Sequence, residues 1–429
     1  MENSLKVNKG TSKRIYFLTQ YFYPDVASTG QLLTELAEDL AQYGFEINAL
    51  TAQPSYAKYK QCPNKENYRG INIYRVRSTH FSKNSKMGRI LNMLSFYFSI
   101  FFSLLFRPLK LGIFLIVTNP PVLPFMGILL KKLKKKPYIL LIHDVYPDIA
   151  VKLGYLSPKS IVVRLWDIFN RIAFNNAEKI IVLGDCMKEV IAKKLDKSSQ
   201  SKDKIEVIPN WADGNKIHPV PKASNWFLEK NELKDKFVVL YSGNLGLFHP
   251  LETIIYAADN LKDKDMLFLF IGEGGKKSVL ERMVAERELK NVMFLPYQDK
   301  EVLAHSLSSG DIAIIAMEKD IKGLGVPSKL YSLLAAGRPI LALVEEGSEV
   351  DLVLKEANCG FSVMPDDVRR ITSILEQLYK NKAMLSELSV NARKYFDSHF
   401  NRSDITKQYF EVISSIFKNN EPIYVTKSP

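Results

Sequence analysis

The stretch GLGVPSKLYSLLAAGRPILA, residues 323–342, has the pattern of a loop, a short helix, a tight stop and a strand. The loop delivers Pro327, Ser328 and Lys329 to the start of the helix, and Ser332 follows one turn later. Backbone amides and a lysine at such a place suit a phosphate. The stretch therefore predicts an α/β unit with an anion site, and it raises the question of which acidic residue would contact the hydroxyl groups of a ligand.

The same alternation of apolar strands and helices runs along the whole chain. Apolar runs predict strands in the first half at residues 14–19, 46–52, 71–76, 113–118, 138–142 and 179–183, and in the second half at 237–241, 266–271, 292–295, 311–316, 339–344 and 361–363. Continuous apolar strands separated by helices favour parallel sheets that are covered on both faces. The sequence predicts an α/β protein with two doubly wound domains, whose ligands bind beyond the carboxyl ends of the strands.

Length and charge narrow the organisation and the class of partner. A chain of 429 residues is too long for one ordinary core, so two domains of roughly 200 residues are expected. Prolines, asparagines and a glycine mark a linker near residues 209–226. The net charge of +13 indicates an anionic partner, such as nucleic acid, an anionic membrane surface or a phosphorylated substrate. Aromatic residues are not interleaved with the basic run at 131–136, so nucleic acid is not expected.

The cysteines and the N-terminal residues indicate the cellular compartment in which the protein is expected. Cys62, Cys186 and Cys359 are odd in number and far apart, which gives neither a disulfide framework nor a metal-binding spacing. A reducing compartment is therefore expected. The polar first residues lack the apolar core of a signal peptide, so secretion is not expected.

Residues 90–106 form an apolar segment without a single charged side chain. If it is helical, Ser95, Ser99 and Ser103 lie along one face. Basic residues flank the segment at Lys83, Lys86, Arg89, Arg107 and Lys110. One interpretation is a helix in the membrane interface, with its basic flanks on anionic lipid. The other is a buried helix packed beneath the first domain, while a transmembrane span fits less well because Pro108 and a strand follow directly.

Two loops of the first half end on residues that could act on a ligand. Ser28, Thr29 and Gly30 lead into a helix, where the amides favour anions and glycine permits close approach. The alternative is that Ser28 or Thr29 only caps that helix. His143 and Asp144 follow a buried strand, and adjacent titratable residues at a strand end are candidates for proton or charge transfer. The alternative is that Asp144 caps the next helix and His143 makes a core hydrogen bond.

Two glycine turns of the second half could cradle phosphates. Gly243, Asn244 and Gly246 follow the first predicted strand of this half, and their bare amides could hold a pyrophosphate. Gly272 and Gly274 break the next strand-to-helix turn, which could equally be a turn before a solvated basic helix. Histidines and acidic pairs lack the spacing of metal ligands, so neither a protein-held metal nor another cofactor is expected.

Taken in order, these motifs resemble a glycosyltransferase of the GT-B fold, in the large retaining group called family 4. The resemblance is strongest to the branch that builds bacterial capsule, O-antigen and exopolysaccharide, including enzymes of colanic acid and N-acetylfucosamine transfer. The motifs that carry it are YFYPDVASTGQLLTELAEDLAQYGFEI, HDVYPDIAVKLGYL, YSGNLGLFHPLETII, IGEGG and VPSKLYSLLAAGRPILA.

The resemblance implies an architecture and a reaction. Two Rossmann-like domains would face a cleft, with an acceptor-side domain at 1–212, a nucleotide-sugar domain at 213–394 and a helix at 395–429 that crosses back. A sugar would pass from a UDP- or GDP-linked donor to a polyprenyl-diphosphate-linked saccharide, with retention and without a metal. The enzyme would lie in the cytoplasm, at the inner face of the membrane. The oligomeric state is not predicted.

The resemblance also implies roles by position. His143 and Asp144 would lie near the reacting sugar. The donor would be held by a set of small and polar loop residues together with Lys329: Ser28, Thr29, Gly30, Gly243, Asn244, Gly246, Gly272, Gly274, Pro327, Ser328, Lys329, Leu330 and Ser332.

The chain departs from the family pattern where many members carry charged residues. Two glutamates that often lie in the loop of 323–342 correspond here to Leu324 and Ser332, and an arginine and a lysine correspond to Asn244 and His249. Neutralisation of the diphosphate is therefore expected from backbone amides and Lys329. The departures keep two alternatives open: a non-catalytic scaffold subunit that binds nucleotide, and a nucleotide-sugar epimerase.

Overall fold

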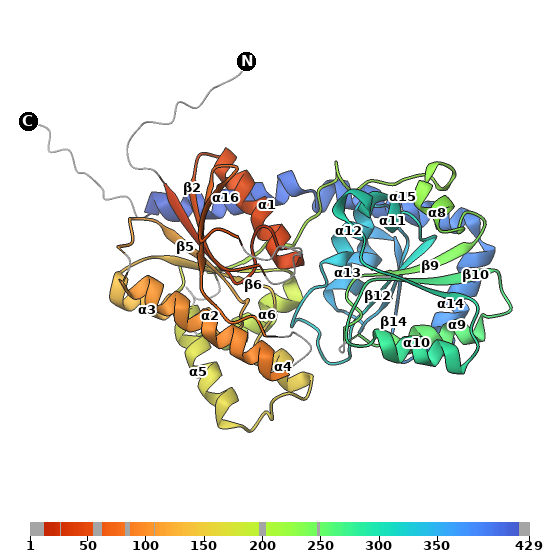
Figure 1. Ribbon diagram of the computed structural model, residues 1–429, viewed down its shortest axis with the longest axis horizontal. Helices are drawn as coiled ribbons and strands as arrows, with labels where there is room; N and C mark the ends of the chain where they lie inside the picture. The colour runs from red at the N-terminus through yellow and green to blue at the C-terminus, as the bar shows by residue number, and fades with distance from the viewer. Residues whose placement is uncertain are drawn as a thin grey trace, which may run out of the picture.

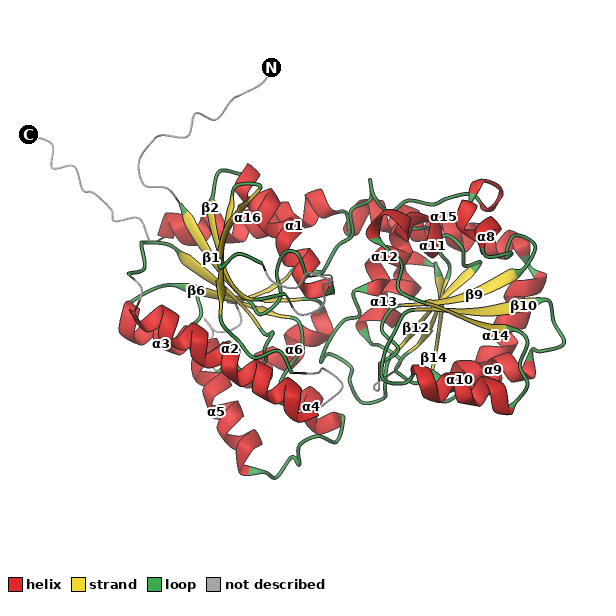
Figure 2. Ribbon diagram, in the orientation of Figure 1, coloured by secondary structure: helices red, strands yellow, loops and turns green. Residues whose placement is uncertain are grey.

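The computed structural model describes residues 13–25, 27–54, 62–81, 86–106, 108–196, 203–246 and 249–419. Two sheets, each with helices on both faces, lie side by side along the long axis of the molecule (Figures 1 and 2). Of the basic residues expected to flank the apolar helix, Lys83 and Arg107 lie outside the described residues. So do the first twelve and last ten residues of the expected domains.

The first sheet has eight strands in the order β3-β4-β2-β1-β5-β6-β7-β8. Its strands are β1 (Arg14–Leu18), β2 (Glu46–Ala52), β3 (Lys65–Tyr68), β4 (Ile71–Val76), β5 (Ile113–Val117), β6 (Tyr138–Ile142), β7 (Lys179–Val182) and β8 (Ile205–Val207). Its helices are α1 (Ser28–Gln42), α2 (Lys86–Phe106), α3 (Phe125–Lys134), α4 (Asp148–Lys152), α5 (Ile161–Asn176) and α6 (Asp185–Lys194). All neighbouring strands are parallel except β3, which runs antiparallel to β4. The sequence pattern missed β3 because this edge strand, KENY, is polar and partly exposed.

The second sheet has six parallel strands in the order β11-β10-β9-β12-β13-β14. They are β9 (Phe237–Ser242), β10 (Met266–Ile271), β11 (Val292–Leu295), β12 (Ile312–Ala316), β13 (Ile340–Leu343) and β14 (Gly360–Val363). The helices are α8 (Trp226–Lys230), α9 (Glu252–Asn260), α10 (Lys277–Glu286), α11 (Leu303–Leu307), α12 (Lys329–Ala335), α13 (Glu349–Ala357), α14 (Val368–Lys380), α15 (Lys382–His399) and α16 (Arg402–Asn419). The strand order reverses between β9 and β12, which is where such sheets bind ligands. The predicted doubly wound α/β class is confirmed.

The chain returns to the first domain at residues 400–402. Phe396 is fully buried in the core of the second domain, so α15 belongs there through its last turn. The backbone of Phe400 accepts from the amide of Ala212 at 3.2 Å, and the amide of Arg402 donates to Ala212 at 3.0 Å. The expected crossing at residue 395 therefore falls within α15, because packing of that helix continues past the point where the sequence pattern suggested a break.

Helix α16 is fixed to α1 by a half-buried ion-pair cluster. The Arg402 guanidinium donates to both carboxylate oxygens of Asp39, at 2.9 and 2.6 Å, and to Glu38 at 3.0 Å. The indole of Trp211 donates to Glu35 at 2.9 Å in the same region. Figure 1 shows α16 lying along the first domain beside α1. The last helix thus ties the two domains together.

Helix α2 has one buried edge and an exposed apolar face. Phe96, Ile100 and Leu104 are fully buried along one edge, so the helix does pack on the first domain. The rest of its surface is exposed and apolar at Met87, Ile90, Leu91, Leu94, Phe98, Phe102 and Phe106. Within the described residues, Met87–Phe106 is the one helical stretch that is long and apolar enough to cross a membrane, judged by length and composition.

Candidate active site

The loop before α1 contacts the second domain. Helix α1 begins at Ser28, and its N-cap, Ala27, makes no side-chain capping bond. Neither Ser28 nor Thr29 is therefore the cap that the simpler interpretation required. The Ser28 hydroxyl donates instead to the hydroxyl of Ser328 at 2.8 Å. Gly30 is buried under the turn at residues 21–25, where an added Cβ would touch the backbone of Phe22 at 3.4 Å.

His143 and Asp144 follow β6 at its carboxyl end. Their backbone amides approach the Thr118 hydroxyl at 2.9 and 3.4 Å, which fixes the strand end. Asp144 does not cap α4, because the N-cap of that helix is Pro147. Burial lowers the pKa of His143 to about 4 and raises the pKa of Asp144 to about 6. At neutral pH the pair thus combines a neutral imidazole with a carboxylate that protonates easily.

A backbone bridge joins this pair to the second domain. Asp144 and Gly325 form an isolated antiparallel bridge, and the amide of Val145 donates to the oxygen of Leu324 at 2.8 Å. A Cβ on Gly325 would lie 2.8 Å from the Asp144 carboxylate, so glycine is what permits the approach. The structure therefore brings the strand-end pair of one domain against the loop of residues 323–329 in the other.

Leu324, which corresponds to an acidic position in the family that the sequence resembles, is carried by this bridge into an apolar environment. Leu324 is 5% exposed and packs, together with Ile321, into the core of the first domain. A carboxylate at this position would be buried among apolar side chains at a high desolvation cost. The loop thus forms an apolar contact between the two domains through Ile321 and Leu324.

Two further loop positions contribute packing rather than a polar group for a ligand. The Leu330 side chain is fully buried in the second domain. The Ser332 hydroxyl donates to the backbone oxygen of Lys329 at 3.1 Å, within its own helix. Neither Leu330 nor Ser332 supplies the acidic side chain that was expected to contact the hydroxyl groups of a ligand.

The glycine turns after β9 and β10 are stacked on one another. Gly272 has a φ of +148°, and a Cβ there would lie 1.9 Å from the carbonyl oxygen of Gly243. Gly274 also lies close to a backbone oxygen, that of Leu245, at 2.3 Å from a Cβ position. Gly246 lies against the Asn244 side chain, 2.7 Å from a Cβ position. Gly272 and Gly274 are required by the close approach of two backbones, which builds one continuous rim at the carboxyl edge of the sheet.

Lys329 lies on this rim. Its Nζ is buried and has no hydrogen-bond partner among the described residues. The nitrogen lies 3.1 Å from where a Cβ on Gly243 would be, and 3.8 Å from the ring centroid of Tyr241. Burial lowers the pKa of Lys329 to about 7. A buried amine without an acceptor, set against a glycine turn, is a candidate for recognising an anion.

Several polar residues near this rim were not expected from the sequence. The Lys276 ammonium donates to the oxygen of His249 and to the carboxylate of Glu252, both at 2.7 Å. Glu318 follows β12 at the switch point, and burial raises its pKa against the opposing effect of Lys276. Tyr241 lies directly beneath Lys329. A polar residue that follows a buried strand was the available signal for Glu318, whereas nothing local marks Tyr241.

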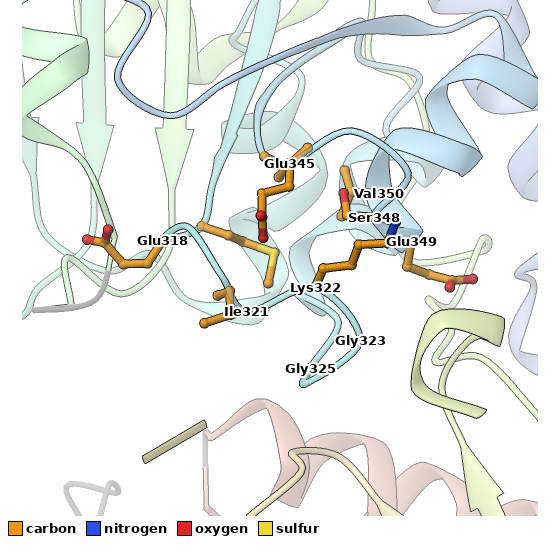
Figure 3. Close-up of a pocket in the computed structure, with 11 residues that line it drawn as sticks. Glu318, Ile321, Lys322, Gly323, Gly325, Glu345, Ser348, Glu349 and Val350 are labelled. Carbon is orange, nitrogen blue, oxygen red and sulfur yellow. The ribbon is translucent and has the colours of Figure 1, made fainter. Parts of the chain in front are cut away.

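A pocket borders the loop that joins the domains. It is lined by residues 321–323, by Gly325 and by the residues that follow β12 and β13. Figure 3 shows Glu318 and Glu349 pointing in opposite directions from it. Glu349 reaches α6, where it accepts from the amide of Cys186 at 3.4 Å. Among the described residues, no group of three histidine, cysteine or acidic side chains could hold a metal ion.

Two family profiles match successive parts of the chain. Residues 29–216 match Glycosyltransferase Family 4, and residues 224–395 match Glycosyl transferases group 1. The chain belongs to the family 4 glycosyltransferases. Its two matched halves correspond to the two sheets, and the fold is GT-B, as predicted.

Curated relatives of this glycosyltransferase carry related names. It is 29% identical to the probable glycosyltransferase WbjE of Pseudomonas aeruginosa, over 69% of this chain and 73% of that protein. It is 26% identical to the putative colanic acid biosynthesis glycosyl transferase WcaI of Escherichia coli K12, over 91% of this chain and 97% of the relative.

Solved structures share the fold at low identity. Sucrose-phosphate synthase from Thermosynechococcus elongatus superposes with a TM-score of 0.76 at 15% identity, covering 95% of this glycosyltransferase and 100% of that chain. Anabaena HepE in complex with UDP-glucose superposes with a TM-score of 0.68 at 14% identity, covering 94% and 99%.

Proposed function

We propose that this glycosyltransferase moves a sugar from a UDP- or GDP-linked donor to a lipid-linked saccharide in the assembly of a surface polysaccharide. One observation carries the proposal: the buried Lys329 ammonium and the Gly243 turn lie on the second domain, while the loop of Lys329 bridges to Asp144 of the first. A diphosphate on the rim would place its sugar toward that pair. The names of HepE with UDP-glucose and of WcaI in colanic acid biosynthesis support the donor class and the pathway.

The donor diphosphate would be neutralised without a metal or another cofactor. Lys329 would supply a positive charge, because a bound anion favours the protonated amine that burial disfavours, and the amides of the glycine turns would supply partial charges. In a buried site, such fixed donors act strongly on the charge that develops on a leaving diphosphate. Ser28, Thr29 and Gly30 would approach the same phosphates from the first domain, because Ser28 already contacts Ser328.

Glu318 is the carboxylate that we assign to the hydroxyl groups of the nucleoside. It stands at the carboxyl end of β12, next to the switch point, and Figure 3 shows it pointing away from the interdomain loop. The place is distinct from Leu324 and Ser332, where family members often carry acids. Because Leu324 packs between the domains, we assign the acidic contact to Glu318, which follows β12.

The transfer is proposed to retain the anomeric configuration. As the diphosphate leaves, the acceptor hydroxyl would attack from the same face, so no protein nucleophile is required. The Asp144 carboxylate would stabilise the positive charge that develops on the sugar. The neutral His143 would hydrogen-bond to the sugar. Both residues touch the substrate in this scheme, which is why they remain the proposed catalytic pair.

The acceptor is proposed to be a polyprenyl-diphosphate-linked saccharide at the inner face of the cell membrane. Besides α2, helix α5 exposes an apolar row at Ile161, Val162, Leu165, Ile168 and Phe169. Figure 1 shows α2 and α5 on the same side of the first domain. Arg89, Arg164 and Arg171 are exposed on these two helices and would suit anionic headgroups. The enzyme would thus be cytoplasmic and peripheral to the membrane.

A donor panel followed by transfer assays tests the proposal. Thermal unfolding is measured with UDP- and GDP-sugars, and the stabilising donor is then incubated with polyprenyl-diphosphate-linked sugars, with and without EDTA. We expect one nucleotide class to stabilise the protein and EDTA-resistant transfer with retention at the anomeric carbon. Binding without turnover would favour a scaffold subunit instead. Conversion of the donor sugar without an acceptor would favour an epimerase.

A further inference from the structure

Tyr241 is a buried tyrosine at the end of β9 that contacts both parts of the proposed diphosphate subsite. Its side chain is 1% exposed. Its ring lies against the Lys329 ammonium, with 3.8 Å between Nζ and the ring centroid. Its hydroxyl donates to the backbone oxygen of Asn244 at 2.9 Å. A single side chain therefore touches the lysine and the glycine turn.

The ring takes the place of a hydrogen-bond acceptor for Lys329. A lysine stem has four rotatable bonds, so an ammonium without a partner would otherwise sample many positions. A desolvated cation over an aromatic face is held by about 2 kcal/mol. The ring itself cannot swing away, because Phe270 and His249 pack beside it with centroids at 6.0 and 6.5 Å. The ammonium is thereby kept against Gly243.

The Tyr241 hydroxyl orients the second part of the subsite, the turn at residues 243–246. A carbonyl oxygen turned toward a phosphate would repel it, and the turn at residues 243–246 carries several carbonyl oxygens. The bond from Tyr241 engages the oxygen of Asn244 and holds it on the tyrosine side. The turn can then present its amide face to an anion.

We propose that Tyr241 is a positioning residue for the donor diphosphate, whose ring fixes the Lys329 ammonium and whose hydroxyl fixes the Asn244 carbonyl. The inference rests on the proposed function only in taking the ligand to be a nucleoside diphosphate sugar. Tyr241 acts through Lys329 and the turn, so its loss weakens the binding of the phosphates and leaves the nucleoside contacts unchanged.

Calorimetric titration with UDP and with inorganic pyrophosphate tests this role. Tyr241→Phe keeps the ring and loses the hydroxyl bond, so Kd rises by about three- to tenfold. Tyr241→Leu also loses the ring, so Kd rises by about tenfold more. The same two changes are repeated with Lys329→Met. In that background the ring has no cation to hold, so the Phe and Leu variants bind with equal Kd.

Tyr138→Phe is the matched control. Tyr138 is equally buried in the first domain, and its hydroxyl also donates to a backbone oxygen, that of Ala173. This variant keeps the wild-type Kd, and thermal unfolding shows that each Tyr241 variant is folded. A wild-type Kd for folded Tyr241→Leu, or an equal ring effect with and without Lys329, overturns the inference. Wild-type protein that binds pyrophosphate but no nucleotide sugar contradicts the proposed function and leaves this role standing.

Discussion

Lys329 is a residue whose proposed function conflicts with stability. Its buried ammonium lacks a hydrogen-bond acceptor among the described residues, and such a group destabilises a fold by about 1–3 kcal/mol. We expect Lys329→Met to raise the free energy of unfolding by at most about that amount, because the Tyr241 ring offsets part of the penalty, and to weaken stabilisation by nucleotide. Chemical unfolding with and without UDP measures both effects. The exposed Lys234→Met serves as the control and should change neither.

The pKa of Lys329 predicts how the stability gained in Lys329→Met depends on pH. Because the folded pKa falls from 10.5 to about 7, the unfolded chain binds more protons between these values. The penalty is therefore complete below pH 7 and disappears toward pH 10.5. The stabilisation by Lys329→Met should shrink over the same window. A gain that is independent of pH would show that the ammonium is not the destabilising group.

Asp144 predicts the acid limb of the activity. Its pKa is raised to about 6 by burial, so the carboxylate gains a proton as the pH falls through 6. If the carboxylate stabilises the reacting sugar, kcat/KM should fall about tenfold per pH unit below that value. In Asp144→Asn the activity should be low and this limb should vanish. An unchanged acid limb in the variant would assign the titration to another group.

At the scale of the element, α2 predicts membrane binding that is separable from folding. Phe102 is 53% exposed, whereas Ile100 is fully buried on the same helix. Phe102→Glu should abolish co-sedimentation with phosphatidylglycerol vesicles while leaving thermal unfolding and UDP binding unchanged, because its ring contributes little to the core. Ile100→Glu should instead fail to fold, because it buries a charge. Vesicle binding that survives Phe102→Glu would contradict docking through α2.

At the scale of the whole molecule, Gly323 predicts control of domain closure. Its φ is +73°, and a Cβ there would lie 2.7 Å from the backbone oxygen of Cys186 in the opposite domain. Gly323→Ala should keep the domains apart, so kcat should fall at least tenfold while UDP still binds the second domain. Small-angle X-ray scattering should show a larger radius of gyration.

Gly154 provides the matched control for this change. Its φ is +74°, and nothing lies within 4 Å of an added Cβ. Gly154→Ala therefore introduces the same backbone strain without the clash between domains. If both variants lose the same activity, strain rather than closure accounts for the effect.

Much of the fold could be read from local pattern. Apolar runs as short as residues 113–118 and 138–142 favour buried strands, and the helical spacing between them favours a parallel sheet with helices on both faces. Glycines directly after β9 and β10 marked the rim, because only glycine allows the close backbone approach seen at Gly272. Periodicity fails for an edge strand such as β3, whose polar residues need no buried face.

By itself the sequence determined two α/β domains, the positions of His143 and Asp144 at a strand end and of Lys329 at a helix start, and the resemblance to family 4. Only the tertiary structure decided that Leu324 packs into the opposite domain, that Tyr241 lies against Lys329, and that α2 keeps most of its apolar surface exposed. The reason is physical. Local conformational preference and burial periodicity set each element, whereas contacts between residues far apart in the chain depend on how the two domains pack.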